Sequence, residues 1–371
     1  MLRRMTQLGL SALALLLYAA AASADVPYRP LAFPADHAGH MSELEAHPFL
    51  VEWWYFAGDL ESTAGEQLAF SAGIFDMKQT SEEGVVSHNY WVLFSVTDVD
   101  AEVYHFTIPS GYYPASDVFI SEKHLDINYA DAFVLEQRRC KSEFTFRGQA
   151  VSAAEVPVAV DLRLVPKAPP LLHSTDQGET LGIVDMRDGG NSYYYSLTDL
   201  VTRGTVTIGD ETYRICGRKS TTWFDHQWGD FLPNATHGYN WFAVRLDNGL
   251  RGMVAVDVAR GTFEEGVEWV EENDPRSVLG GFATFKLPNG DVTHLTLDDT
   301  FALNRSNYWQ GFSGNIYPLN HLLSFDALGL EMDIRAVFEN QDQGGYEGVC
   351  TVDATYLEMP VWGTAQLEIG P

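Results

Sequence analysis

The segment at residues 223–229, Trp-Phe-Asp-His-Gln-Trp-Gly, places a carboxyl and an imidazole between aromatic rings. If this segment is a β-strand, Trp223, Asp225 and Gln227 share one face, because successive side chains point to opposite sides. A carboxyl among aromatic rings loses water, so we expect the pKa of Asp225 to rise and the group to find a partner or hold a proton. Two roles follow for Asp225: a general acid, or a structural group locked by backbone donors.

Other aromatic residues gather beside acids and histidines in the same way. Residues 52–56 are Glu-Trp-Trp-Tyr-Phe, and residues 193–195 are three tyrosines. Most of these rings are expected to fill a core, while those beside Glu52, Asp225 and His226 indicate a ligand pocket. The predicted ligand-binding residues are Glu52, Trp53, Trp54, Tyr55, Tyr194, Trp223, Trp228 and Trp241. The predicted catalytic residues are Asp225 as the acid, with His226 and His88 to orient water or carry the proton.

Three histidines and three acids cluster ahead of the first predicted strand: Asp36, His37, His40, Glu43, Glu45 and His47. These residue types bind metal ions in proteins. They lie, however, in a polar lead-in that contains proline, and this is typical of a solvated arm. We therefore favour the solvated arm and predict no metal site and no cofactor.

The chain lacks the motif of a serine hydrolase. The nearest pattern, at residues 311–315, is Gly-Phe-Ser-Gly-Asn, which has no second glycine in register. If the chain is an enzyme, we do not expect it to be a serine-triad hydrolase.

Strands must position these residues, because apolar and polar side chains alternate along most of the chain. Residues 158–164 and 330–335 have the two-residue period of a half-buried strand. Turn sequences separate the strands, with Asp-Asn-Gly at 247–249 and Pro-Asn-Gly-Asp at 288–291. Amphipathic helices are few. The predicted fold class is all-β and antiparallel, in barrels or sandwiches that protect the sheet edges.

The composition excludes several classes of protein. The chain has 371 residues, with 23 Lys and Arg against 51 Asp and Glu and a formal net charge of −28. Binding to nucleic acid needs clustered basic residues, so we expect no nucleic-acid partner. The acid excess also disfavours an anionic membrane surface. Cys140, Cys216 and Cys350 allow at most one disulfide, and we favour buried free thiols.

Residues 1–24 predict a secretory signal peptide. Arg3 and Arg4 supply the positive region, residues 8–22 are apolar, and Ala-Ser-Ala at 22–24 fits a cleavage site. We expect cleavage after Ala24 and a periplasmic or secreted protein. No stable membrane insertion is expected once this segment is removed.

Several motifs together resemble one protein family. They are Glu-Trp-Trp-Tyr-Phe at 52–56, Tyr-Tyr-Ser-Leu-Thr-Asp-Leu at 194–200 and Trp-Phe-Asp-His-Gln-Trp-Gly at 223–229. With these motifs the chain resembles the AttH-like and carotenoid 1,2-hydratase family over the whole expected mature length. The resemblance implies two lipocalin-like β-barrel domains, at residues 25–235 and 236–371, with a ligand cleft between or within them.

Three positions depart from the pattern of that family. Gln227 stands where a Glu is common, Asp59 stands where a His is frequent, and Tyr346 precedes Glu347 directly where a Trp often intervenes. The Glu-Trp-Trp-Tyr form resembles the AttH-like branch more than the carotenoid hydratases.

Two classes of function follow from the residues and the resemblance. The first is an enzyme acting on an apolar, unsaturated small molecule, either an alkene hydratase (a hydro-lyase) or an isomerase that cyclises its substrate, with Asp225 as general acid. The second is a periplasmic carrier that binds a hydrophobic ligand without turnover. Both classes have a hydrophobic small molecule as partner, and no oligomeric state is predicted.

Overall fold

The computed structural model describes residues 29–40, 51–80, 86–107, 112–137, 142–186, 190–231, 238–258, 278–297 and 301–370. Within these ranges the chain forms two antiparallel β-sheets and three short 3-10 turns. The turns are η1 (Ala35–His37), η2 (Ala115–Asp117) and η4 (Asp326–Leu328). The predicted all-β fold with two lipocalin-like parts is confirmed. Among the described residues, no helix is long and apolar enough to cross a membrane.

The first sheet has 14 strands, and its main path runs β4-β3-β2-β1-β14-β12-β9-β8-β7-β6-β5. The strands are β1 (Val51–Glu61), β2 (Gln67–Thr80), β3 (Val86–Asp98), β4 (Val103–Phe106), β5 (Val118–Ile120), β6 (Asp126–Tyr129), β7 (Phe133–Gln137), β8 (Phe144–Val151), β9 (Pro157–Pro166), β10 (Leu171–Leu172), β11 (Ile183–Asp185), β12 (Asn191–Ile208), β13 (Glu211–Ile215) and β14 (Thr221–Gly229). The sheet curls around one core, because Phe94 of β3 meets Phe133 of β7 with ring centroids 5.3 Å apart.

The second sheet has 9 strands in the order β18-β17-β16-β15-β23-β22-β21-β20-β19. They are β15 (Gly238–Leu246), β16 (Arg251–Val258), β17 (Val278–Lys286), β18 (Val292–Thr296), β19 (Phe301–Gln310), β20 (Ile316–Phe325), β21 (Leu330–Ala336), β22 (Tyr346–Tyr356) and β23 (Met359–Gly370). The turns predicted at 247–249 and 288–291 join β15 to β16 and β17 to β18, as expected. In β21, Leu330, Met332 and Ile334 point into the second core, which confirms the predicted alternation.

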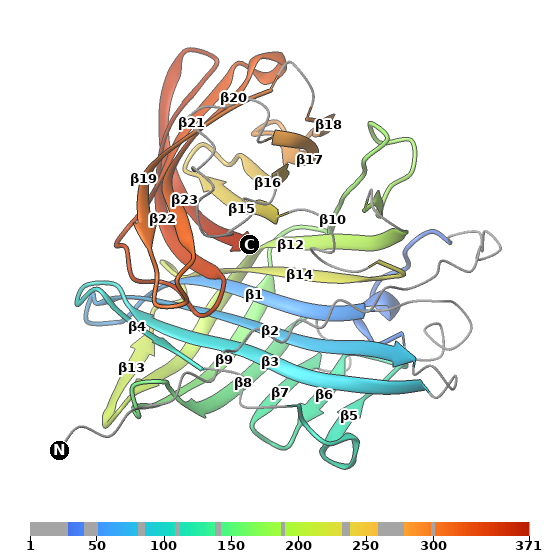
Figure 1. Ribbon diagram of the computed structural model, residues 1–371, viewed down its shortest axis with the longest axis vertical. Helices are drawn as coiled ribbons and strands as arrows, with labels where there is room; N and C mark the ends of the chain where they lie inside the picture. The colour runs from blue at the N-terminus through green and yellow to red at the C-terminus, as the bar shows by residue number, and fades with distance from the viewer. Residues whose placement is uncertain are drawn as a thin grey trace.

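The outer face of the first sheet packs against the second sheet. Figure 1 shows the second sheet, in yellow to red, above β12, β14 and β1. Apolar residues of both sheets form a third buried cluster there, which includes Tyr55 and Trp223 from the first sheet and Trp241 from the second. Arg251 of β16 adds an ion pair to Asp199 of β12, with N···O 2.8 Å. β1 and β14 therefore have two buried faces, one toward their own core and one toward the other sheet.

Several predictions from the sequence concern residues that lie outside the described ranges or next to them. The change from the first sheet to the second occurs between Gly229 and Gly238. The predicted domain boundary at 235/236 lies outside the described residues, as do residues 1–24 and Cys140. Of the other cysteines, both are free thiols, but only Cys350 is buried, and burial raises its pKa.

Candidate functional site

The two faces of β1 and β14 carry different groups of the predicted site residues. In the ladder between these strands, Tyr55 lies opposite Asp225 and Trp54 lies opposite His226. Trp54 belongs to the core of the first sheet, whereas Tyr55 belongs to the cluster between the sheets. Because side chains alternate along a strand, Glu52 and His226 face the core while Asp225 faces the second sheet. Glu52, Asp225 and His226 therefore do not share one pocket. The residues expected in a single site are divided between two sites, one on each face.

Asp225 lies at the centre of the site between the sheets. Its carboxylate accepts hydrogen bonds from the Tyr194 hydroxyl at 2.7 Å, from the Trp223 ring N–H at 2.6 Å and from the Ser196 hydroxyl. The donors are side chains, not the backbone groups that the sequence analysis considered. Burial dominates over these donors and raises the pKa of Asp225 to about 7. The carboxyl therefore titrates near neutral pH and not in the acidic range usual for Asp.

Two glutamates of the second sheet complete this site. Glu347 of β22 and Glu368 of β23 are direct partners in their ladder. The Tyr55 hydroxyl donates to Glu347 at 2.7 Å across the sheets, and the Tyr239 hydroxyl donates to Glu368. Burial, reinforced by the charge of Glu368, raises the pKa of Glu347 well above its usual range, and burial raises that of Glu368 to about 7. We call Asp225, Glu347 and Glu368 the inter-sheet acids.

Glu347 and Glu368 are site residues that the sequence did not indicate. The available signal was weak: Glu368 stands between two apolar residues, Leu367 and Ile369, which point into the second core. Alternation alone turns Glu368 to the other face, toward Asp225. Which acids of the second sheet meet that face depends on how the two sheets pack.

Aromatic rings surround the inter-sheet acids. Trp241 donates its ring N–H to the Tyr194 hydroxyl at 2.9 Å and meets Trp223 edge to face, with centroids 6.4 Å apart. Tyr55 also meets Trp241 edge to face at 5.6 Å. These rings exclude water and present π-faces, each of which attracts a cation by about 0.5–2 kcal/mol. Of the predicted ligand-binding residues, the structure brings Tyr55, Tyr194, Trp223 and Trp241 together here.

A groove of about 670 Å³ opens beside this cluster, between β11 and β17. Met186 and Phe282 line it, and both also pack in the buried cluster between the sheets. Gln227, which shares the face of Asp225, donates to the Met186 sulfur at 3.5 Å. The groove therefore reaches the edge of the site that holds the inter-sheet acids, and its volume lies in the range of small-molecule sites.

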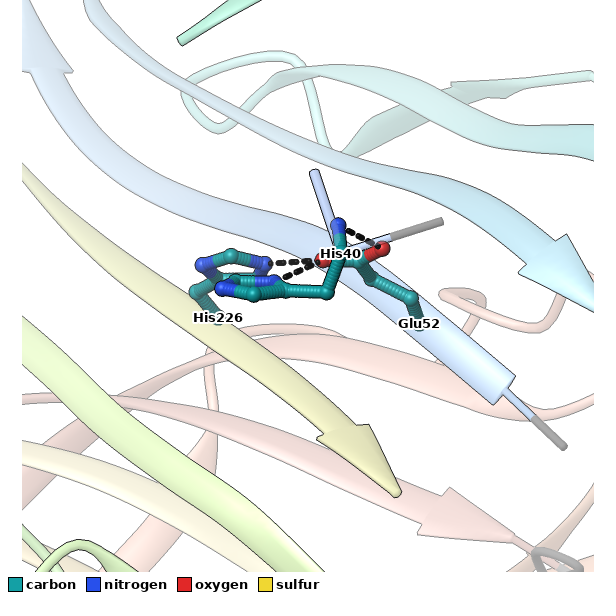
Figure 2. Close-up of side chains that lie close together, drawn as sticks. All are labelled: His40, Glu52 and His226. Atoms are coloured by element: carbon teal, nitrogen blue, oxygen red, sulfur yellow. Dashed lines mark hydrogen bonds and ion pairs between the residues drawn. The ribbon is translucent and has the colours of Figure 1, made fainter. Parts of the chain in front are cut away.

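The other face of β1 and β14 holds a cluster of His40, Glu52 and His226, which we call the His–Glu cluster. Glu52 Oε1 lies 2.7 Å from His40 Nδ1 and 2.9 Å from His226 Nε2, and the His40 backbone N–H donates to Glu52 Oε2 at 3.0 Å (Figure 2). All three residues are buried, and their ligand atoms lie within 4.8 Å of one another. Burial alone raises the pKa of Glu52, but the two histidines outweigh it and lower the pKa to about 2.

His40 reaches the His–Glu cluster because the segment before β1 folds back against the first sheet. The Asp36 carboxylate accepts two hydrogen bonds from Arg29, at 2.7 and 2.8 Å, and its backbone oxygen lies 3.0 Å from His226 Nδ1. Asp36, His37 and His40 are only 3%, 6% and 5% exposed. The predicted solvated arm is therefore wrong for these three residues, because their polar groups find partners inside the fold. Glu43, Glu45 and His47 lie outside the described residues.

His88, predicted to assist Asp225, lies on the opposite face of the sheet. Its Nδ1 is 2.7 Å from Asp76 Oδ1, and Asp76 is the direct neighbour of Glu52 in the β1–β2 ladder. Side chains of such directly opposed residues point to the same face, so His88 and Asp76 belong with Glu52 inside the first sheet. The same holds for His226, which the sequence analysis also assigned to Asp225. Neither histidine contacts the inter-sheet acids in the described part of the chain.

The remaining predicted ligand-binding residues divide between the two faces. Trp228 stacks on His40 with ring centroids 3.8 Å apart, and Trp54 stacks on His226 at 4.8 Å. Trp53 packs against the cluster between the sheets. Trp54 and Trp228 therefore enclose the His–Glu cluster, while Trp53 faces the second sheet.

Comparisons with known proteins agree with this fold. A segment of 186 residues, 48% of this chain, is 24% identical to kievitone hydratase of Fusarium solani subsp. phaseoli and spans 49% of that protein. The crystal structure of an AttH protein from Nitrosomonas europaea superposes with a TM-score of 0.68 and 20% identity, over 92% of this chain and 98% of that one. Kievitone hydratase from Nectria haematococca superposes with a TM-score of 0.62 and 17% identity, over 86% of this chain and 88% of that one. These structural likenesses concern the fold.

A family model described as AttH-like matches residues 24–368, which is nearly the whole chain. The motifs that carry the resemblance in the sequence lie within that match, in β1, β12 and β14. The chain belongs to the AttH-like family.

Proposed function

We propose that this chain is an exported hydratase that adds water to a carbon–carbon double bond of an apolar small molecule at the inter-sheet acids. One observation carries the proposal: Asp225, Glu347 and Glu368 are buried between the sheets, each with a tyrosine hydroxyl bonded to it, and burial raises the pKa of each. The similarity to kievitone hydratase supports the reaction class. Hydration of an alkene needs a proton donor, a group that takes a proton from water, and a cavity that tolerates positive charge.

Asp225 is the general acid in this proposal. Its two oxygens offer about four lone-pair directions, and Tyr194, Ser196 and Trp223 occupy three of them. One direction is left for a proton that can pass to the substrate. Because the pKa of Asp225 is about 7, the proton is both present and transferable at neutral pH.

Glu347 and Glu368 supply the second proton site. Adjacent carboxyls do not both ionise readily, so one holds a proton while the other can accept one. Besides burial, the charge of Asp225 also contributes to raising the pKa of Glu368, so Glu368 is the glutamate assigned as the base that takes a proton from the attacking water. Trp223 and Trp241 face the carbon that becomes cationic after protonation. The same acid serves a cyclisation, in which a second double bond replaces water as the nucleophile.

A carrier without turnover is the second candidate function. Three donors on one buried carboxylate are also what a structural role for Asp225 requires. Under this alternative the cluster between the sheets is a rigid lining, and the ligand enters from the groove without reaction.

The variant Asp225→Asn separates the two functions. The full chain is incubated with kievitone and with an acyclic carotenoid, and hydrated products are sought by mass spectrometry. The hydratase proposal expects a product from the parent chain, and it expects a loss of at least about 100-fold in Asp225→Asn with ligand affinity and Tm nearly kept. Asp199→Asn, in the Arg251 ion pair between the sheets, is the matched control and keeps activity. Ligand binding without any product from the parent, together with a lower Tm in Asp225→Asn, supports the carrier instead.

Export is part of the proposal and has its own test. Residues 1–24 have the pattern of a signal peptide, and residue 25 is Asp. Amino-terminal sequencing of the protein recovered from its host is expected to begin at Asp25. A mature chain that still begins at Met1 contradicts export by this route.

A further inference from the structure

We propose that His40, Glu52 and His226 form a binding site for one divalent transition-metal ion inside the first sheet. The site is separate from the inter-sheet acids and does not rest on the hydratase proposal. Its three residues come from the segment after η1, from β1 and from β14, and their ligand atoms lie within 4.8 Å of one another. Figure 2 shows both imidazole rings directed at the same carboxylate.

The hydrogen bonds of His226 indicate what lies between its ring and Glu52. The backbone oxygen of Asp36 is 3.0 Å from His226 Nδ1, and a carbonyl oxygen only accepts. The Tyr195 hydroxyl also lies 3.1 Å from Nδ1, but it donates its hydrogen to the same Asp36 oxygen, so Nδ1 carries a hydrogen of its own. In a neutral imidazole Nε2 then has a lone pair, and it points at Glu52 Oε1 only 2.9 Å away. Two lone pairs at this distance need either an additional proton or a cation. A metal ion satisfies both atoms at once.

The surroundings match the usual partners of metal-binding histidines. Such a histidine commonly donates its second ring N–H to a backbone carbonyl or a carboxylate, which fixes the ring and its tautomer. His226 donates to the Asp36 backbone oxygen at 3.0 Å, and His40 Nε2 lies 3.5 Å from the Asp36 carboxylate. Asp36 is held in turn by Arg29. Both rings are thus oriented before any ion binds.

An acid next to the His–Glu cluster provides an independent observation. Asp76 is the direct neighbour of Glu52 in the β1–β2 ladder, and its side chain is fully buried. Its Oδ1 is paired with His88, but its Oδ2 has no hydrogen-bond partner among the described residues. A buried carboxylate oxygen without a partner is costly unless a proton or a cation is near. An ion pair confined to Glu52 and the histidines gives this oxygen no partner, whereas a cation bound at the cluster lowers the cost of burying it.

The donor set selects the class of ion. Two imidazole nitrogens and one carboxylate suit Zn²⁺, Fe²⁺ and related ions, while Mg²⁺ and Ca²⁺ prefer oxygen ligands. Metal bonds of about 2.1 Å in a tetrahedral arrangement place the ligand atoms roughly 3.4 Å apart. The present separations from Glu52 Oε1 are 2.7 Å to His40 and 2.9 Å to His226, so the site must open by about 0.5–0.7 Å to reach the tetrahedral spacing. The ion would fasten the segment at residues 29–40 to β1 and β14.

The test uses the full chain without a histidine tag, treated with a chelator and then titrated with Co²⁺ and with Zn²⁺. We expect one ion per chain, visible ligand-field bands of Co²⁺ bound to nitrogen and oxygen, and a rise of several degrees in Tm with Zn²⁺. Glu52→Gln and His226→Gln should each weaken binding by at least about 100-fold. The control is His321→Gln, because His321 is equally buried but lies in the second sheet. It should bind the ion like the parent chain.

A measurement on the parent chain keeps the test decisive if the variants fold poorly. Metal binding must displace the protons that now lie between Glu52 and the histidines, so Zn²⁺ added to a weakly buffered solution should release protons. The proposal is overturned if the parent chain binds no Co²⁺ or Zn²⁺ with release of protons. It is also overturned if folded Glu52→Gln and His226→Gln variants bind the ion as tightly as the parent.

Discussion

Individual carboxyls of this protein respond to burial in opposite ways. Among the described residues Asp225 has hydrogen-bond donors but no cationic partner, so burial raises its pKa to about 7. Glu52 is just as buried but lies between His40 and His226, which lower its pKa to about 2. The neighbours of a carboxyl, and not its burial alone, thus decide whether it stores a proton or a charge.

Asp225→Asn should change the pH dependence of stability in a defined direction. A group whose pKa is raised in the folded state stabilises the protein below its unfolded pKa, and that contribution is lost as the pH rises through the folded value of about 7. Asn does not ionise. We expect the free energy of unfolding of the parent chain, relative to the variant, to fall by roughly 2–3 kcal/mol from pH 5 to pH 8. Urea unfolding at both pH values measures this, and parallel curves for the two proteins contradict it.

Glu52→Gln should show the reverse trend at acidic pH. A carboxyl with a lowered pKa contributes stability above its unfolded value of 4.5, and this is lost as the pH falls toward the folded value of about 2. The parent chain should therefore exceed the variant in stability at pH 6, and the difference should shrink by about 2 kcal/mol at pH 3. Denaturant titrations with a chelator present exclude a contribution from metal. A constant difference would show that Glu52 is not the group that titrates.

At the scale of elements, the close contact between β14 and β12 positions Asp225. Gly229 ends β14, and a β-carbon there would lie 2.2 Å from the backbone oxygen of Asn191. The glycine of the Trp-Phe-Asp-His-Gln-Trp-Gly segment therefore lets β14 approach the start of β12. That approach sets Asp225 within reach of the Tyr194 hydroxyl.

Gly229→Ala should destabilise the fold, because the backbone of β12 must move to admit the methyl group. The expected loss is about 1–3 kcal/mol, seen as a fall of several degrees in Tm. The matched control is Gly345→Ala, where the nearest heavy atom to the added carbon is the Ile369 oxygen at 3.4 Å. Equal losses in the two variants would contradict a specific contact between β14 and β12.

The alternation of strands made the fold predictable, but the site only in part. Trp223 lies two residues before Asp225, and Tyr194 lies in β12, the strand paired with β14. The aromatic composition and the two-residue alternation of strands therefore indicate these residues directly. Glu347 and Glu368 lie more than a hundred residues further along, and only the packing of one sheet on the other brings them to Asp225. The solvated arm predicted around His40 is wrong for a similar reason. Nothing in its local sequence shows that the segment folds back onto Glu52.

At the scale of the whole molecule, a strongly acidic net charge accompanies three buried acids between the sheets whose pKa values are raised. The formal net charge of −28 is spread over the chain and opposes a compact state through self-repulsion. The inter-sheet acids avoid adding to that charge because their raised pKa values favour the neutral form. The two sheets can therefore pack closely although both carry acids at their contact.

Salt should stabilise the protein if self-repulsion is the main electrostatic term. Added NaCl shortens the screening length from about 30 Å at 0.01 M to about 10 Å at 0.1 M. We expect Tm to rise by a few degrees over this range and then to level off. A fall in Tm would mean that ion pairs between the sheets, such as Arg251 with Asp199, contribute more than the repulsion.

Water addition at the inter-sheet acids is tested most directly by the origin of the oxygen in the product. The full chain is incubated with an alkene substrate in water enriched in ¹⁸O, and the product is analysed by mass spectrometry. The proposed mechanism predicts a product heavier than the substrate by one labelled water, formed by the parent chain and by Asp199→Asn but not by Asp225→Asn or Glu368→Gln. Equal yields of labelled product from the parent and from both site variants, or no labelled product from the parent chain, would contradict it.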